Sequence, residues 1–250
     1  MDVLLERQVS GLCSVSQTYP IPTLLTTAEH LQARDFSELV TEVRQLQRRR
    51  VTIVSLRRQR AMRIGLQKLK TVLDDAGIRV CALGYSGGFT GALKLSYDDA
   101  VRDTRRALVT AAELGARCLI VAPGSRGLHT YNHADQVVRD GLCDCLDDAL
   151  RLRIDMLLPL NTVFGNRSDV FRLRDCSGLD WVESFGSHRI HPMMVLRGAT
   201  PWQRLPDCWK RCLRNGGMLR ISPRCRKTLG GHNLISEMLS HLTNVAVPVS

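Results

Sequence analysis

Arginine and histidine side chains follow several of the apolar runs that the sequence predicts to be strands. Arg58 and Arg60 follow one such run, Arg126 and His129 follow another, and Arg197 follows a third. A guanidinium group can bind phosphate or carboxylate through two parallel hydrogen bonds, and an imidazole can act as a general base near neutral pH. The pattern therefore predicts a site for a small anion, with His129 as the candidate catalytic base.

Glycine and asparagine residues accompany these side chains. Gly87 and Gly88 follow a predicted strand, and Asn132 lies in the same loop segment as His129. Because glycine has no Cβ, its backbone amide can approach a ligand closely. We expect Gly87, Gly88 and Asn132 to bind the substrate together with the arginines. We interpret His133 as a polar loop residue, because no carboxylate at a strand end accompanies it.

No carboxylate stands at the end of any predicted strand. The residues found there are Ser14, Arg57, Arg58, Tyr85, Ser86, Ser125, Arg126, Asn161, Arg197, Ser222, Arg224 and Pro248. Magnesium, manganese and zinc sites need carboxylate, imidazole or thiolate ligands. The sequence therefore predicts neither a metal site nor a cofactor at these positions.

The elements that must position these residues alternate between short β-rich runs and helical stretches. Predicted strands occupy 8–15, 51–56, 78–83, 118–122, 156–160, 193–196, 218–221 and 245–247, and predicted helices occupy 35–47, 66–76, 97–114, 132–152, 179–185, 205–213 and 233–242. Apolar residues at spacings of three and four mark the buried faces of the helices. The predicted second strand is almost continuously apolar, which is typical of a parallel sheet covered on both faces.

Eight strands alternating with helices in 250 residues predict an α/β fold with a parallel sheet. Helical crossovers join parallel strands in a right-handed sense, and eight such units match the (β/α)8 TIM barrel. We therefore expect a single barrel domain over residues 1–250. The alternative is an open doubly wound sheet, but no Gly-x-Gly-x-x-Gly turn follows the first predicted strand.

The chain is strongly basic and carries few aromatic residues. It has 35 Lys and Arg residues against 24 Asp and Glu residues, which gives a net charge of +11, and only five of the basic residues are lysines. Proteins that bind nucleic acid tend to gather their cations on one face and to interleave aromatic side chains. Here the arginines are spread along the chain, so we expect a solvated arginine-rich surface and no nucleic-acid partner.

We expect neither a membrane-spanning nor a secreted protein. No apolar run approaches the roughly 20 residues that a bilayer crossing requires, and the acidic residues near the N-terminus do not fit a signal peptide. The nine cysteines include no Cys-x-x-Cys pair, which argues against zinc-ribbon and thioredoxin-like sites. An odd number of cysteines without a signal peptide indicates reduced thiols, and we expect a cytoplasmic protein.

Three segments resemble the sugar phosphate isomerase/epimerase family, whose fold is the xylose isomerase-like barrel. They are Arg58-Gln59-Arg60, Gly87-Gly88-Phe89-Thr90-Gly91 and the segment from Gly124 to Ala134. The resemblance covers about residues 51–134 and is fainter through Arg174. It implies chemistry at the C-terminal mouth of the barrel, where a divalent cation held by carboxylates and a histidine polarises the sugar while acidic side chains move a proton.

The sequence departs from the family at its expected metal ligands. Leu158 stands before Pro159 where the resemblance implies Glu, and Leu196-Arg197-Gly198 stands where it implies Asp. The last two strands end without the expected His and Glu. We therefore expect a divergent member that has lost the metal site and metal-dependent turnover. It would keep an arginine-lined mouth for a sugar phosphate or another small anion.

Two alternatives remain open at this stage. The first is a metal-independent sugar isomerase or epimerase that uses His129 as the base and arginines to stabilise an enediolate. The second is a non-catalytic nucleic-acid-binding barrel, because apurinic endonucleases share this barrel by resemblance and the net charge has the right sign. The sequence also leaves the oligomeric state open, with a homo-oligomer among the alternatives.

Overall fold

The structure is a computed structural model of the 250-residue chain. It describes residues 28–91, 94–159, 181–182, 184–187, 189–196 and 218–221. The strands are β1 (Glu29–His30), β2 (Ile53–Arg57), β3 (Arg79–Gly87), β4 (Cys118–Ala122), β5 (Asp155–Pro159), β6 (Ile190–Leu196) and β7 (Met218–Ile221). The helices are α2 (Phe36–Arg48), α3 (Arg58–Ile64), α4 (Leu66–Asp75), α5 (Tyr97–Glu113) and α6 (Tyr131–Leu152).

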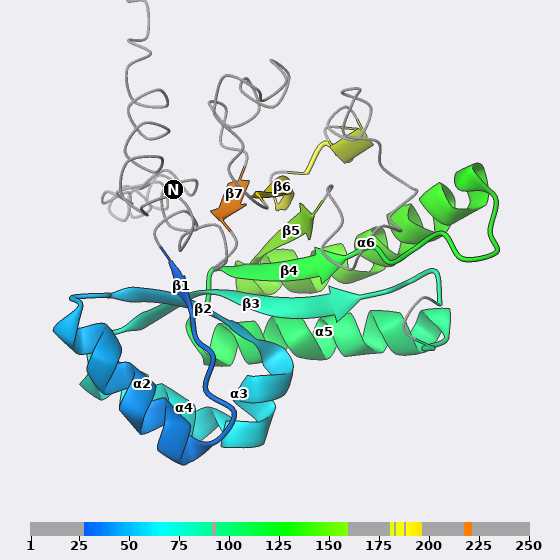
Figure 1. The fold of residues 1–250 in the computed structure, drawn as a ribbon. Helices are drawn as coiled ribbons and strands as arrows, with labels where there is room; N and C mark the ends of the chain where they lie inside the picture. The colour runs from blue at the N-terminus through cyan, green and yellow to red at the C-terminus, as the bar shows by residue number, and fades with distance from the viewer. Residues whose placement is uncertain are drawn as a thin grey trace, which may run out of the picture.

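The described strands form one parallel sheet in the order in which they occur in the chain, from β1 to β7. Glu29 of β1 lies opposite Val54 of β2, and Cys118 of β4 lies opposite Asp155 of β5. Figure 1 shows α2, α4 and α5 along one side of this sheet. Consecutive parallel strands joined by helices are the arrangement expected of a (β/α) barrel.

The hydrophobic pattern predicts most of the described elements. The helices predicted over 35–47, 66–76, 97–114 and 132–152 are confirmed as α2, α4, α5 and α6, and the strands predicted from 51–56 to 218–221 are confirmed as β2 to β7. Of the helix predicted over 179–185, Trp181 and Val182 are described and helical. The strands predicted over 8–15 and 245–247, and the helices over 205–213 and 233–242, lie outside the described residues.

Three features differ from the prediction. β1 at Glu29–His30 was not expected, because two residues are too few to show a pattern. Helix α3 was missed because it is only 7 residues long and begins directly after β2 without a capping side chain. Strand β3 continues to Gly87, whereas the glycines at its end favour a turn in the sequence.

Capping side chains fix where the longer helices begin. Ser96 accepts a hydrogen bond from the backbone N–H of Asp99 at 3.1 Å, so Ser96 is the N-cap of α5. Thr130 accepts from the N–H of His133 at 3.3 Å, so α6 begins at Tyr131, one residue earlier than predicted. Such caps satisfy backbone donors that have no partner within the helix.

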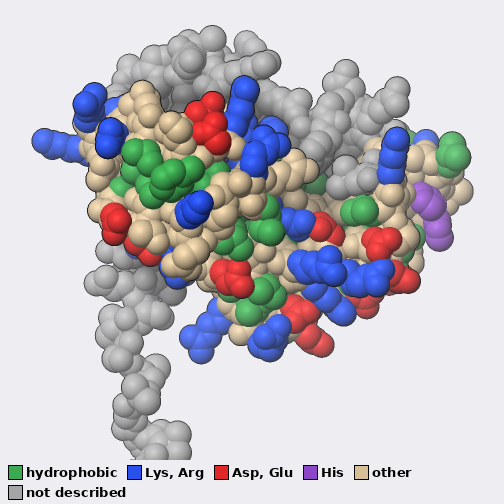
Figure 2. Space-filling model, turned by 90° about the horizontal axis from the view of Figure 1, so that it is seen from below, with side chains coloured by type: hydrophobic (Ala, Val, Ile, Leu, Met, Phe, Trp, Pro, Cys, Tyr) green, Lys and Arg blue, Asp and Glu red, His purple; other side chains and the backbone are tan. Residues whose placement is uncertain are grey.

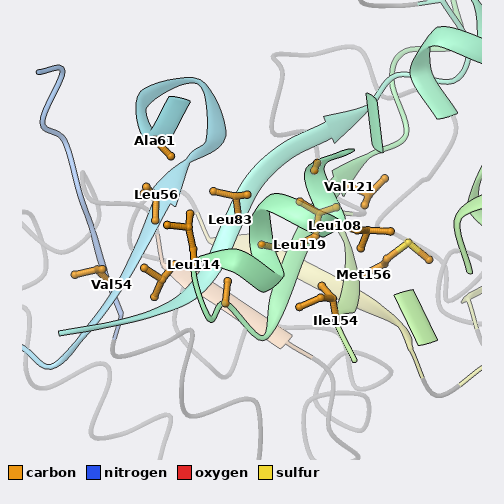
Figure 3. Packing of buried hydrophobic residues seen from close by; sticks show 14 of the residues in the cluster. Val54, Leu56, Ala61, Leu83, Leu108, Leu114, Leu119, Val121, Ile154 and Met156 are labelled. Carbon is orange, nitrogen blue, oxygen red and sulfur yellow. The ribbon is translucent and has the colours of Figure 1, made fainter. Parts of the chain in front are cut away.

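Alternate residues of the strands pack on opposite faces of the sheet. One face packs against the helices, and Figure 3 shows Leu56, Leu83 and Leu119 of the strands in the same cluster as Leu108 of α5. The other face carries a smaller cluster made almost entirely of strand residues, namely Ala28, Cys81, Ala82, Cys118, Ile120, Leu157 and Met193. Both faces are apolar, as the apolar runs in β2 and β4 predict for a parallel sheet that is covered on both sides.

Among the described helices, none is both long enough and apolar enough to cross a bilayer.

Candidate functional site

The C-terminal ends of parallel strands meet at one edge of the sheet, where ligands of such folds bind. Strands β1 to β5 end at His30, Arg57, Gly87, Ala122 and Pro159. None of these five residues is a carboxylate. The candidate site is therefore made by the loops that follow β3 and β4 at this edge.

Three contacts join the loop after β3 to the end of β4 and the loop that follows it. The N–H of Gly88 donates to the carbonyl of Ala122 at 2.8 Å. The hydroxyl of Thr90 donates to the carbonyl of Ser125 at 2.6 Å, and Nε2 of His129 lies 3.3 Å from the carbonyl oxygen of Thr90. The predicted site residue His129 is thus anchored from the neighbouring loop rather than standing alone.

Arg126 makes its contacts with residues in or next to its own loop, the one after β4. Its Nη1 donates to the carbonyl of His129 at 2.6 Å, and its guanidinium lies 4.7 Å from the centre of the Tyr131 ring. Its Nε is buried and makes no hydrogen bond to any described residue. The structure therefore places Arg126 and His129 in contact and holds the guanidinium by hydrogen bonding and by stacking.

His133 and Asn132 lie in the first turn of α6 and are exposed. The rings of His129 and His133 have centroids 4.8 Å apart, so the two imidazoles are neighbours. Figure 2 shows histidine side chains exposed at one end of the molecule. On the helical face in the same view, Lys and Arg side chains are interspersed with Asp and Glu side chains.

Arg58 and Arg60 make their main contacts elsewhere. Arg58 forms a two-armed ion pair with Asp103 of α5, with 2.9 Å from Nη1 to Oδ2, and also donates to the carbonyl of Asp103 at 3.0 Å. Arg60 donates to the carbonyl of Leu31 at 3.2 Å and to the side-chain oxygen of Gln32 at 2.9 Å. Both guanidinium groups thus join elements of the fold. No sequence pattern marks Asp103 as the partner of Arg58, because the two residues lie far apart in the chain.

The environment of Arg60 is unfavourable to its charge. Burial lowers the pKa of its guanidinium, and the neighbouring positive charges of Arg57 and Arg34 lower it further. Two carboxylates, Glu42 and Glu38, act in the opposite direction. The three arginines Arg34, Arg57 and Arg60 therefore lie close together near the C-terminal end of β2.

Gly87 and Gly88 have backbone conformations that the close approach of β3 to β4 requires. Gly87 has φ +100°, and a Cβ at this position would lie 2.3 Å from the carbonyl oxygen of Ala122. Gly88 has φ 77°, and its N–H donates the hydrogen bond to that same oxygen.

Arg197, the remaining predicted site residue, lies outside the described residues.

The side chains that the structure describes at this edge do not fit the ligands of a divalent cation. Within the described part of the chain, no three His, Cys, Asp or Glu residues are grouped so that they could hold a metal ion. Leu158 is fully buried in the cluster that packs against the helices. The buried carboxylate of Asp155 lies at the opposite edge, where β5 begins, and pairs with Arg189 at 2.8 Å.

The chain is similar in fold to solved structures of sugar epimerases and of an endonuclease. The 3-keto-D-glucoside 4-epimerase of E. coli is 14% identical, with a TM-score of 0.66 over 86% of this chain and 86% of that chain. AP endonuclease, family 2 from Brucella melitensis is 15% identical, with a TM-score of 0.62 over 78% of each chain. A D-psicose 3-epimerase from Clostridium cellulolyticum H10 is 11% identical, with a TM-score of 0.59 over 86% of this chain and 94% of that chain.

At these identities the likeness shows the fold alone. A search of curated proteins finds no match. The model of the xylose isomerase-like TIM barrel family, by contrast, matches residues 35–171, which is more than half of the chain and includes the loops after β3 and β4. The α/β sheet is therefore that of a TIM barrel, and the chain belongs to the xylose isomerase-like TIM barrel family.

Proposed function

We propose that this protein is a sugar isomerase/epimerase-like barrel that has lost metal-dependent turnover and binds a sugar phosphate or another small anion at its mouth. The observation that carries the proposal is the chemistry of the strand ends. Strands β1 to β5 end without a carboxylate, while Arg126 and His129 lie together in the loop after β4. Such a donor set attracts an anion and lacks the oxygen ligands of a hard cation.

Arg126 is the residue that we expect to bind the anion directly. A buried N–H without a partner costs about 1–3 kcal/mol, and a phosphate or carboxylate oxygen that accepts from Nε would remove this cost. Stacking on Tyr131 holds the guanidinium plane in one orientation before the ligand arrives. Less side-chain freedom is then lost on binding.

Thermal unfolding of the full chain tests the proposal. The ligands are a set of pentose and hexose phosphates, the same sugars without phosphate, and manganese, cobalt and zinc ions. A ligand at 100 times its Kd adds about 2.7 kcal/mol, which corresponds to a rise in Tm of about 5–10 °C for a chain of this size. We expect a sugar phosphate to give this rise.

Variants of Arg126 make the test specific. Arg126→Ala should abolish the rise, and Arg126→Lys should retain only part of it, because an ammonium cannot form the same planar pair of hydrogen bonds. The control is Arg151→Ala, which removes an equal charge from an exposed side chain in the last turn of α6. Stabilisation by manganese or zinc, with none by sugar phosphates, would overturn the proposal.

A second candidate function is metal-independent isomerisation with His129 as the base. The observation that favours it is the pair of neighbouring imidazoles, His129 and His133, beside a guanidinium. Exchange of sugar-phosphate hydrogens with deuterium in D2O, in the presence of EDTA, would report such proton transfer by NMR. Exchange that is lost in His129→Gln would support this candidate. Binding without exchange would eliminate it and leave the first proposal standing.

A further inference from the structure

Thr90 contacts the candidate site through both its side chain and its backbone. Its hydroxyl donates to the carbonyl of Ser125 at 2.6 Å, and its own carbonyl oxygen lies 3.3 Å from Nε2 of His129. Thr90 is buried, with an exposed fraction of 7%. The sequence assigned it no role, because nothing in a sequence marks a residue whose backbone carbonyl lies beside an imidazole.

The chemistry of a carbonyl decides which nitrogen of His129 carries the proton. A carbonyl oxygen can only accept a hydrogen bond, so Nε2 must be the donor in this contact. In the neutral imidazole only one nitrogen is protonated, and Nδ1 is then an acceptor. Nδ1 makes no hydrogen bond to any described residue, and it is not among the buried atoms that lack a partner.

Packing behind Thr90 holds its carbonyl in place. The preceding residue, Phe89, is buried against α6, where a Cβ added at Gly141 would lie 2.5 Å from the ring. The hydroxyl of Thr90 is bonded to Ser125, and on the other side of the carbonyl the N–H of Gly91, in the same peptide unit, donates to the carbonyl of Gly88 at 3.0 Å. The carbonyl is therefore held from two directions, in the way that supporting residues orient a functional histidine.

We infer that Thr90 is a positioning residue that holds His129 as the Nε2–H tautomer and so presents Nδ1 to the ligand as a hydrogen-bond acceptor. This inference deepens the proposed function and rests on it for the identity of the ligand. In its neutral form His129 then offers an acceptor, Nδ1, and the carbonyl of the same residue is bonded to a cationic donor, Arg126. The complementary ligand carries a hydroxyl group near an anionic oxygen, as a polyhydroxylated phosphate monoester does.

The tautomer is measured directly on the full chain labelled with 15N-histidine, at a pH above 7.5. Comparison with His129→Gln assigns the resonances of His129. We expect the Nε2–H tautomer in the wild type. A protonated Nδ1, or an equal mixture of the two tautomers, would overturn the inference whatever the protein binds.

Variants of Thr90 test whether its hydroxyl holds the arrangement. Thr90→Val keeps the shape and removes the hydroxyl, and we expect a mixed tautomer population in it, whereas Thr90→Ser should keep the wild-type tautomer. The control is Thr110→Val, which removes a hydroxyl that bonds to the carbonyl of Arg106 within α5. A wild-type tautomer in Thr90→Val would contradict the role of the hydroxyl.

Two small phosphate monoesters test the ligand class. Glycerol 3-phosphate and propyl phosphate share the phosphate group and differ in their hydroxyl groups. We expect the wild type to bind the first about fivefold more tightly, as one hydrogen bond predicts, and His129→Gln to bind both alike. Equal binding by the wild type would overturn the inference. Binding of neither compound would count against the proposed function, and the tautomer measurement would still decide the role of Thr90.

Discussion

Gly141 of α6 is packed against the loop that carries Thr90, and its replacement by alanine should destabilise the protein. An ideal Cβ at Gly141 would lie 2.5, 2.6 and 2.9 Å from three ring atoms of Phe89. Phe89 is only 2% exposed, so the ring has little room to move. The helix itself gains from the substitution, because alanine is the better helix former. The sign of the change therefore depends on which effect is larger.

The magnitudes favour destabilisation. Carbon atoms pack at about 3.5–4.0 Å, so the ring would have to retreat by about 1 Å. Overpacking of this kind costs about 1–3 kcal/mol, and the helix propensity returns roughly 1 kcal/mol. We place the overpacking near the upper end because three ring atoms clash at once. The net loss is then about 1–2 kcal/mol, or about 2–8 °C in Tm for a chain of this size.

Thermal and urea unfolding of Gly141→Ala, followed by circular dichroism, measure this loss. Cys143→Ala is the matched control, because it changes an exposed residue of the same helix and should shift the stability by less than about 0.5 kcal/mol. Phe89→Leu should partly relieve the clash, so the double mutant should be more stable than the sum of the single changes predicts. A Gly141→Ala protein as stable as the wild type would refute the packing of Phe89 against α6.

Two further predictions concern ion pairs. Burial acts to raise the pKa of Asp155, but the nearby imidazole of His191, 3.9 Å away, and the hydrogen bond from Arg189 outweigh it and hold the pKa below its ordinary value. This stabilisation is therefore present above the unfolded-state pKa of about 3.9 and is lost as the pH falls below it. Asp155→Asn should lose about 1.5–3 kcal/mol near neutral pH, the value of a hydrogen bond to a charged group, and should lose less further stability in acid. An unchanged acid dependence would contradict this. The Arg58 and Asp103 pair, which is partly exposed, should give a coupling of about 1 kcal/mol in a double-mutant cycle, and a coupling near zero would show that it does not join α3 to α5.

The elements that the sequence predicted best are those with the strongest local signals. Helices α2, α4, α5 and α6 each carry apolar residues at helical spacing, and β4 ends at the predicted residues because it is a continuous apolar run. The same reasoning failed for β1 and α3, which are too short to show a period. The first residue of α2, Phe36, has helical spacing with the buried residues of that helix but is 44% exposed.

The sequence placed the proposed site residues after the right strands, but it did not predict their contacts. Arg126 and His129 were expected together because they lie three residues apart in one loop, and the structure joins them through a hydrogen bond. Arg58 was expected beside them, but its guanidinium is held by Asp103. A linear pattern shows where cations occur and does not show which of them already have a partner.

The amino-acid sequence is enough to predict the alternation of strands and helices, the absence of carboxylates at the predicted strand ends, and the loop that carries Arg126 and His129. These features depend on composition and periodicity within short segments of the chain. The folded arrangement is needed to show that Arg58 pairs with Asp103, that Gly87 approaches Ala122 closely, and that the carbonyl of Thr90 lies beside His129. Each of these contacts joins segments that are far apart in the chain, and only the register of neighbouring strands brings them together.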